Sequence, residues 1–200
     1  MTEKQERVLA LARAQGVIRP SDLKRVGATS SQLRGLVASG TITRSARGLY
    51  RLSDHEFTES HSLVEAVRKQ SKGVVCLLSA LSFHEIGTQL PYQVWLAVPY
   101  GTRIAKSNGV PLRVVVATSP GYEAGIESHL IEGVDVAVYS IAKTVADCFK
   151  FRNKIGLDVA LEALREVLRE RRCNRDELRQ YAKTNRVENI MRPYMEAMSI

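Results

Sequence analysis

Glycines divide the first 52 residues into short segments, and their spacing limits what this part of the chain can form. Gly16, Gly27 and Gly40 each follow a stretch with apolar residues at helical spacing, and glycine commonly ends a helix in the left-handed conformation. Residues 41–44 and 49–52 then alternate between polar and apolar side chains, as strands do. The pattern predicts three short helices followed by a two-stranded hairpin.

The third predicted helix has the clearest start. Thr29 and Gln32 have the spacing of a capping box, in which each side chain satisfies a backbone group of the other residue. Apolar residues at 33, 36 and 37 predict a buried stripe, and the opposite face carries small or hydrogen-bonding side chains: Ser31, Arg34, Gly35 and Ala38. Such a face can lie close to a groove floor, where Arg34 reaches guanine or phosphate acceptors.

Positive charge is concentrated in the same segment. Residues 1–52 carry ten Lys or Arg against three Asp or Glu, a net charge of +7, whereas the whole chain carries +8. A basic module attached to a nearly neutral body indicates a polyanionic partner. The alternative interpretation is a protein-docking domain whose charge is only a solvated face.

We therefore predict a winged helix–turn–helix DNA-binding domain over residues 1–53. Its contacts with double-stranded DNA would come from the start and outer face of the third helix and from the hairpin tip. The predicted contact residues are Thr29, Ser30, Ser31, Gln32, Arg34, Arg44, Ser45 and Arg47.

Residues 60–200 have a different pattern, and a polar, acidic linker at 53–60 leads into them through a first helix around residues 63–67. Short apolar or alternating runs predict strands at 73–77, 94–99, 112–116, 127–131 and 134–138. Helical patterns predict helices at 79–87, 141–149 and 157–171, and a last one capped by Asn174. The predicted fold class is α+β: an N-terminal winged helix–turn–helix followed by a mixed α/β C-terminal domain ending in helices.

The sequence contains no motif typical of catalysis or metal binding. The four histidines lack metal-ligand spacing, and no phosphate-binding glycine loop or nucleophile elbow occurs. We therefore predict a protein that is not an enzyme and has no catalytic residue, metal site or cofactor. Asp147 stands out because it lies among apolar residues, where an acid needs a partner. An intramolecular pair with an arginine or a helix cap is the simpler interpretation of this carboxylate.

A second group of basic residues lies near the C-terminal end. Three of its members follow one another at i, i+4 and i+8 on the helix that Asn174 caps. A solvated helix face explains this stripe, and a surface for RNA, DNA or an acidic protein is the alternative. The residues of this possible second basic surface are Arg172, Arg175, Arg179 and Lys183.

The expected location is cytoplasmic, without a membrane partner. No run approaches the roughly 18 apolar residues that a membrane helix needs, and the N-terminus lacks the apolar core of a signal peptide. Cys76 and Cys148 lie in apolar stretches and are predicted to be small buried hydrophobes, while Cys173 lies far from both.

Several motifs follow one another through nearly the whole chain. A glycine-flanked hairpin pattern spans 40–52, the sequence SALSFH spans 79–84, WLAVP spans 95–99, and YSIAKTVADC spans 139–148. In this order they resemble the AbiEi-type antitoxins of type IV toxin–antitoxin and phage abortive-infection systems. The "GxYxL" hairpin ending alone occurs in many regulators, so the resemblance depends on the ordered combination.

The resemblance implies a function for each half of the chain. The N-terminal domain would bind inverted repeats in the operon's own promoter as an autorepressor, with Arg44, Arg47 and the third helix in the contacting role. The C-terminal domain would counteract a nucleotidyltransferase-type toxin, which does not require a stable complex between the two proteins. The resemblance assigns no individual residue to this antitoxin activity.

Two other functions stay open beside this hypothesis of a DNA-binding autorepressor and antitoxin. One is a winged-helix regulator whose C-terminal domain senses a small molecule, with a pocket in the strand-rich region. The other is a nucleic-acid-processing enzyme that uses Asp147 and nearby acids.

Overall fold

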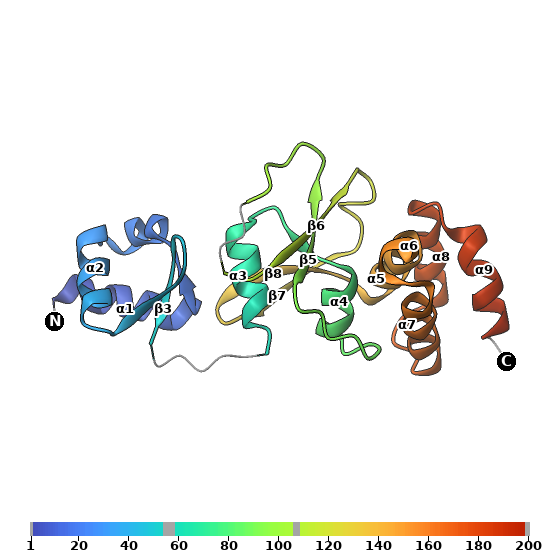
Figure 1. Ribbon diagram of the computed structural model, residues 1–200, viewed down its shortest axis with the longest axis horizontal. Helices are drawn as coiled ribbons and strands as arrows, with labels where there is room; N and C mark the ends of the chain where they lie inside the picture. Colours follow the sequence, from blue (N-terminus) through green and yellow to red (C-terminus); the bar gives the residue numbers. More distant parts are fainter. Residues whose placement is uncertain (1, 54–58, 106–108, 199–200) are drawn as a thin grey trace. The chain divides into compact units, whose positions relative to one another are not determined.

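The computed structural model describes residues 2–53, 59–105 and 109–198, and it has the mixed α+β composition predicted from the sequence (Figure 1). Its contacts divide the chain into two compact units. The first unit consists of Met1–Ser71, Ala105–Pro111 and His129–Val136. The second consists of Lys72–Ile104, Leu112–Ser128 and Ala137–Ile200.

The N-terminal part of the first unit contains the helices and the hairpin in the predicted order. The elements are α1 (Glu3–Gln15), β1 (Val17–Ile18), the 3₁₀ helix η1 (Pro20–Val26), α2 (Ser30–Ala38), β2 (Ile42–Ala46) and β3 (Leu49–Leu52). The second predicted helix is a 3₁₀ helix. The sheet differs from the predicted two-stranded hairpin, because β1 pairs with β3 and makes it three-stranded in the order β1-β3-β2.

Apolar side chains from all these helices form one core. Val8 and Ala12 of α1 are fully buried, as is Ile42 of β2, and Leu33 and Leu36 of α2 are 2 % exposed. The full set of buried residues in this core is Val8, Leu9, Ala12, Ile18, Leu23, Ala28, Leu33, Leu36, Ile42 and Leu52. Because α2 buries its leucines here, its opposite face must point to solvent.

The hairpin is longer and tighter than predicted. Antiparallel pairing runs from Ile42 opposite Leu52 to Ala46 opposite Leu49, so only Arg47 and Gly48 form the turn. Gly48 has φ +77°, a conformation that glycine adopts without the penalty a side chain brings. The register shifts between Arg44 and Ala46, which leaves an extra residue in the first strand.

The first unit also contains α3 (His61–Lys69) and the turn between two later strands. His61 Nδ1 lies 2.8 Å from a carboxylate oxygen of Glu132 in that turn. The side chain of Gln70 accepts a hydrogen bond of 2.9 Å from the backbone N–H of Ala105. The predicted linker at 53–60 falls mostly outside the described residues, because 54–58 are among those not described.

A five-stranded sheet in the order β6-β5-β4-β8-β7 organises the rest of the chain. Its strands are β4 (Val74–Val75), β5 (Val94–Pro99), β6 (Leu112–Ala117), β7 (Ile126–Ile131) and β8 (Val134–Tyr139). β4 pairs antiparallel with β5 and parallel with β8, whereas β5 pairs parallel with β6. The first predicted strand is shorter than expected, because Leu77 (φ +49°) already turns the chain from β4 into a helix.

The helices of the second unit are α4 (Leu77–Phe83), α5 (Ile141–Lys150), α6 (Arg152–Ile155), α7 (Leu157–Arg169), α8 (Arg175–Thr184) and α9 (Glu188–Ala197). The sequence pattern did not predict α6 or α9. Helix α5 lies at the centre, in contact with α4, α7 and α8, and Figure 1 shows α5 to α9 grouped together at the orange-to-red end of the chain. Over the described ranges, no helix is long and apolar enough to cross a membrane.

Gly125 lies where the loop before β7 passes over α5. It has φ +72°, and a Cβ atom there would come within 2.7 Å of Lys143 Cβ. Its carbonyl accepts a 2.7 Å hydrogen bond from the backbone N–H of Ser140, which holds the loop against the start of the helix.

We expect Gly125→Ala to destabilise the protein by about 2–4 kcal/mol, because the side chain adds a steric clash to the backbone strain. Gly101→Ala is the matched control: Gly101 has φ +79°, but a Cβ atom there would meet nothing within 4 Å. That change should lower stability by only about 1 kcal/mol. Urea denaturation measures both, and equal losses would contradict the close approach at Gly125.

Candidate functional site

The outer face of α2 is exposed, as its buried leucines require. Ser30, Ser31 and Arg34 are exposed. Gly35 and Ala38 are exposed as well, and because one has no side chain and the other only a methyl group, the helix surface carries little bulk there. The face therefore presents two hydroxyls and one guanidinium over a surface without bulky groups. This combination permits a close approach to a nucleic-acid groove.

The first residues of α2 are occupied by the predicted capping box. The backbone N–H of Thr29 donates a 2.7 Å hydrogen bond to Gln32 Oε1, and the Thr29 hydroxyl also contacts this oxygen. The Gln32 side chain is half-buried. Thr29 and Gln32 therefore hold the start of the helix, and the Gln32 amide nitrogen is the group that remains available for an outside acceptor.

The hairpin tip carries two of the predicted contact residues on its surface. Arg44 and Arg47 are exposed, and Arg47 is one of the two turn residues. Ser45 lies at the register shift between them and is half-buried. The hydroxyl oxygen of Ser45 is buried, and no hydrogen-bond partner for it occurs among the described residues. The hairpin thus presents two guanidinium groups, whereas Ser45 faces inward.

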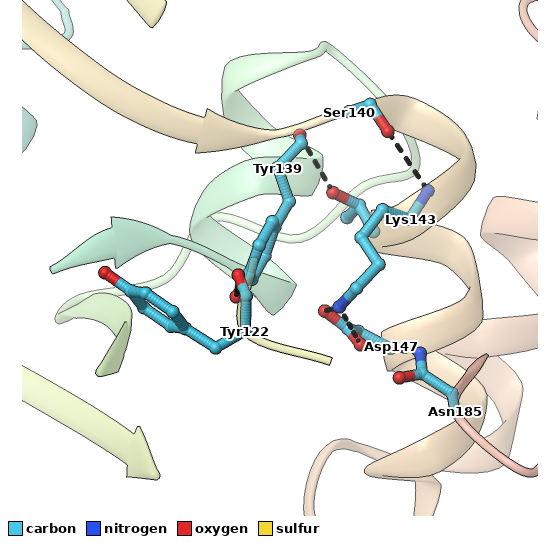
Figure 2. A network of polar contacts seen from close by, with 7 residues as sticks. Tyr122, Tyr139, Ser140, Lys143, Asp147 and Asn185 are labelled. Atoms are coloured by element: carbon cyan, nitrogen blue, oxygen red, sulfur yellow. Dashed lines mark hydrogen bonds and ion pairs between the residues drawn. The ribbon is translucent and has the colours of Figure 1, made fainter. Parts of the chain in front are cut away.

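The predicted buried acid, Asp147, is part of a polar network inside the second unit (Figure 2). Lys143 Nζ lies 2.6 Å from both carboxylate oxygens of Asp147, one helical turn apart on α5. Asn185, which follows α8, donates from Nδ2 to Asp147 Oδ1 at 2.7 Å. Asp147 therefore does have an intramolecular partner, but this partner is a lysine and an amide rather than the predicted arginine or cap.

Neighbouring groups surround the Lys143 ammonium. It lies 4.1 Å from the centroid of the Tyr139 ring, which gives a cation–π contact. The Tyr139 hydroxyl donates a 2.8 Å hydrogen bond to the carbonyl of Tyr122, in the loop that covers this part of α5. The Ser140 hydroxyl accepts from the backbone N–H of Lys143 at 3.4 Å and caps the helix (Figure 2).

Burial dominates the electrostatics of this network. Lys143 is 1 % exposed and Asp147 4 % exposed. Burial lowers the pKa of the Lys143 ammonium and raises the pKa of the Asp147 carboxyl, and the attraction and hydrogen bonds between the two groups oppose both shifts. Each charge therefore compensates the other at a buried site.

The cysteines confirm one expectation from the sequence. Cys76 and Cys148 are buried and free. Burial, together with the negative charge of Asp147, raises the pKa of both thiols, so neither is poised to act as a thiolate. Cys173 is also free, and mainly burial raises its pKa to about 11. No group of three acidic, histidine or cysteine side chains suited to a metal occurs in the part of the chain that the structure describes.

The sequence of the N-terminal elements matches a known family. Residues 6–53 match the family model described as "Transcriptional regulator, AbiEi antitoxin". The AbiEi resemblance is confirmed over these residues. The match covers most of α1 together with η1, α2 and the hairpin, and these elements carry the exposed face and the two arginines of the tip.

Beyond this AbiEi-type module, the comparison with solved structures supports the fold. The whole chain is similar to the crystal structure of the RV2827C protein from Mycobacterium tuberculosis, at 11 % identity and a TM-score of 0.65, and it covers 78 % of that chain. At this identity the likeness extends to the fold alone. No curated protein matches the sequence.

The possible second basic surface divides into two kinds of residue. Arg172 donates to the backbone carbonyls of His84 and Glu85 at 2.6 and 3.1 Å, so it holds the C-terminal end of α4. Arg175, Arg179 and Lys183 are exposed along α8. Arg179 and Lys183 have acidic neighbours at 3.5 and 3.7 Å, which are long surface contacts. Only the α8 residues form an outward basic stripe.

Lys143 and Asn185 are the residues of the network that the sequence pattern did not reveal. The i, i+4 spacing of Lys143 and Asp147 within an otherwise apolar helix was the available signal, because two opposite charges on one buried face indicate a pair. Asn185 had no comparable signal, since it meets Asp147 across 38 residues of sequence.

A double-mutant cycle tests the ion pair. We expect Asp147→Asn and Lys143→Met each to cost about 3–5 kcal/mol of unfolding free energy, because each leaves the other charge buried without its partner. The double variant K143M/D147N removes both charges and should cost less than the sum of the two losses by at least about 2 kcal/mol. Chemical denaturation measures all four proteins. Additive losses would show that the two groups do not interact.

Proposed function

We propose that residues 1–53 form a winged helix–turn–helix that binds double-stranded DNA, and that the protein is a transcriptional autorepressor. The observation that carries the proposal is the low, exposed face of α2 together with Arg44 and Arg47 on the adjoining hairpin. In this arrangement α2 enters the major groove, and the hairpin lies along the phosphate backbone as the wing.

The contacts divide by chemistry. Arg34 on α2 reaches base edges or phosphate, and the hydroxyls of Ser30 and Ser31 donate to phosphate oxygens at the start of the helix. Arg44 and Arg47 neutralise phosphates and fix the register without reading sequence. The net charge of +7 over residues 1–52 supports the same assignment, because counterion release supplies much of the affinity.

We also propose that the protein acts as the antitoxin of a nucleotidyltransferase-type toxin, through residues 60–200 and without a stable complex. The match of residues 6–53 to the AbiEi regulator family supports this proposal, as does the order of motifs along the rest of the chain. In the network of the second unit, Lys143 and Asn185 both donate hydrogen bonds to the carboxylate of Asp147. These contacts favour a structural role for the acid, in keeping with a protein that is not an enzyme.

DNA binding is tested with the protein and a labelled fragment of its own promoter at several salt concentrations. We expect R44Q/R47Q to bind more weakly to all sequences, because two phosphate contacts are lost. The slope of log affinity against log salt should fall by about 2. The matched control is R165Q/R192Q, which removes two exposed charges from α7 and α9. Unchanged binding and salt slope in R44Q/R47Q would contradict the wing assignment.

The antitoxin proposal needs a test that is separate from DNA binding. The adjacent gene, if it encodes a nucleotidyltransferase, is induced in cells that express this protein from an unrelated promoter. We expect growth to be rescued equally by the original protein and by R44Q/R47Q, because the proposed antitoxin activity lies outside the DNA-binding face. Colony counts measure rescue, and failure of the original protein to rescue at confirmed expression would reject the antitoxin role while leaving the repressor role intact.

A further inference from the structure

A cleft of about 280 Å³ lies within the first unit, and none of the proposed DNA-contact residues lines it. Its polar lining consists of three arginines, Arg19, Arg25 and Arg68, with Gln15, Ser71 and Asp135. Arg19 and Arg25 flank or belong to η1, whereas Arg68 belongs to α3. Three guanidinium groups, two from η1 and its cap and one from α3, therefore line one hollow together with a single carboxylate.

Contacts with two neighbours hold Arg68 in place. One terminal nitrogen donates to Asp22 Oδ2 at 3.1 Å and the other donates to Gln15 Oε1, also at 3.1 Å. The side chain is 14 % exposed, and its Nε is buried without a hydrogen-bond partner among the described residues. The terminal nitrogens thus hold the guanidinium in place, and it contributes a fixed positive charge to the cleft.

Positive charge in the cleft is only partly compensated. Asp22 is already engaged, since it accepts from Arg68 and, at 2.8 Å, from the backbone N–H of Arg19. Burial lowers the pKa of Arg19, the positive charge of Arg68 lowers it further, and the negative charge of Asp22 opposes both effects. The two guanidiniums therefore repel each other, and a bound anion would reduce that repulsion.

We propose that this cleft binds a small phosphate-bearing molecule. Arginine forks match phosphate oxygens in pairs, and Arg19 and Arg25 bring two such forks to the hollow, to which Arg68 adds its positive charge. The Ser71 hydroxyl and the Gln15 amide nitrogen add neutral donors, and the Asp135 carboxylate accepts from a hydroxyl or amine of the ligand. The cleft volume of about 280 Å³ lies at the small end of the range for small-molecule sites, and Val67 and Val134 provide apolar lining for a ring. A nucleoside monophosphate has all these features.

The proposal does not depend on DNA binding. None of the cleft residues is among the predicted DNA contacts, so the two sites can be removed separately. A DNA phosphate is the other source of the same chemistry, and the experiment distinguishes it from a free phosphate ester.

Isothermal titration calorimetry on the full chain tests the site, with AMP and inorganic phosphate as probes and adenosine as the uncharged control. We expect AMP and phosphate to bind and adenosine not to bind. R19Q and R25Q should each weaken AMP binding about tenfold, because each removes a charge-assisted contact. Arg68 is left unchanged because it also holds Asp22 and Gln15. R13Q, which removes an exposed arginine of α1 outside the cleft, should bind AMP as the original protein does.

Thermal unfolding without ligand establishes that each variant is folded, and R25Q supplies a second probe because the Arg25 side chain is exposed. The proposal is overturned if AMP and phosphate produce no binding heat at millimolar concentrations, or if folded R19Q and R25Q bind AMP like R13Q. It is also overturned if both variants lose only affinity for DNA, since the cleft would then hold the DNA backbone. R44Q/R47Q should still bind AMP, even if the DNA-binding proposal fails.

Discussion

The ion pair between Lys143 and Asp147 is the interaction on which the second unit depends. It lies on α5, the helix that contacts α4, α7 and α8, and it extends through Asn185 to the end of α8. On its other side, the Tyr139 ring and the loop at Gly125 close over the lysine stem. One pair of charges therefore lies in contact with the end of β8, the covering loop and the residue that ends α8.

Such a pair is weak evidence for stability, because an apolar pair of similar volume would fill the site with less desolvation. A hydrogen-bonded pair also sets a direction for each contact, which apolar packing does not. The carboxylate accepts only where Lys143 and Asn185 donate, and Gly125 leaves no room for the loop to shift over the lysine. We infer that the network selects one packing of the C-terminal helices against the sheet.

The sequence predicted the N-terminal elements well because their signals are local. Thr29 and Gln32, three residues apart, define the start of α2, and alternation over a few residues defines the hairpin. The partner of Asp147 was harder to predict, since Asn185 lies 38 residues away, and the pairing of β1 with β3 joins residues almost as distant in a two-residue strand. The DNA-contact set stays a prediction, and the orientation of Ser45 depends on the register shift beside it, which alternation alone does not reveal.

The length of α2 limits how much sequence one copy of the protein can read. Its nine residues extend roughly 13 Å, which matches about four base pairs of the major groove. A four-base-pair word recurs by chance about every 250 base pairs, far too often to mark one promoter. If α2 is the reading element, a single copy identifies a half-site and no more. Selectivity must then come from the spacing between several such short motifs, so the arrangement of repeats specifies the binding site.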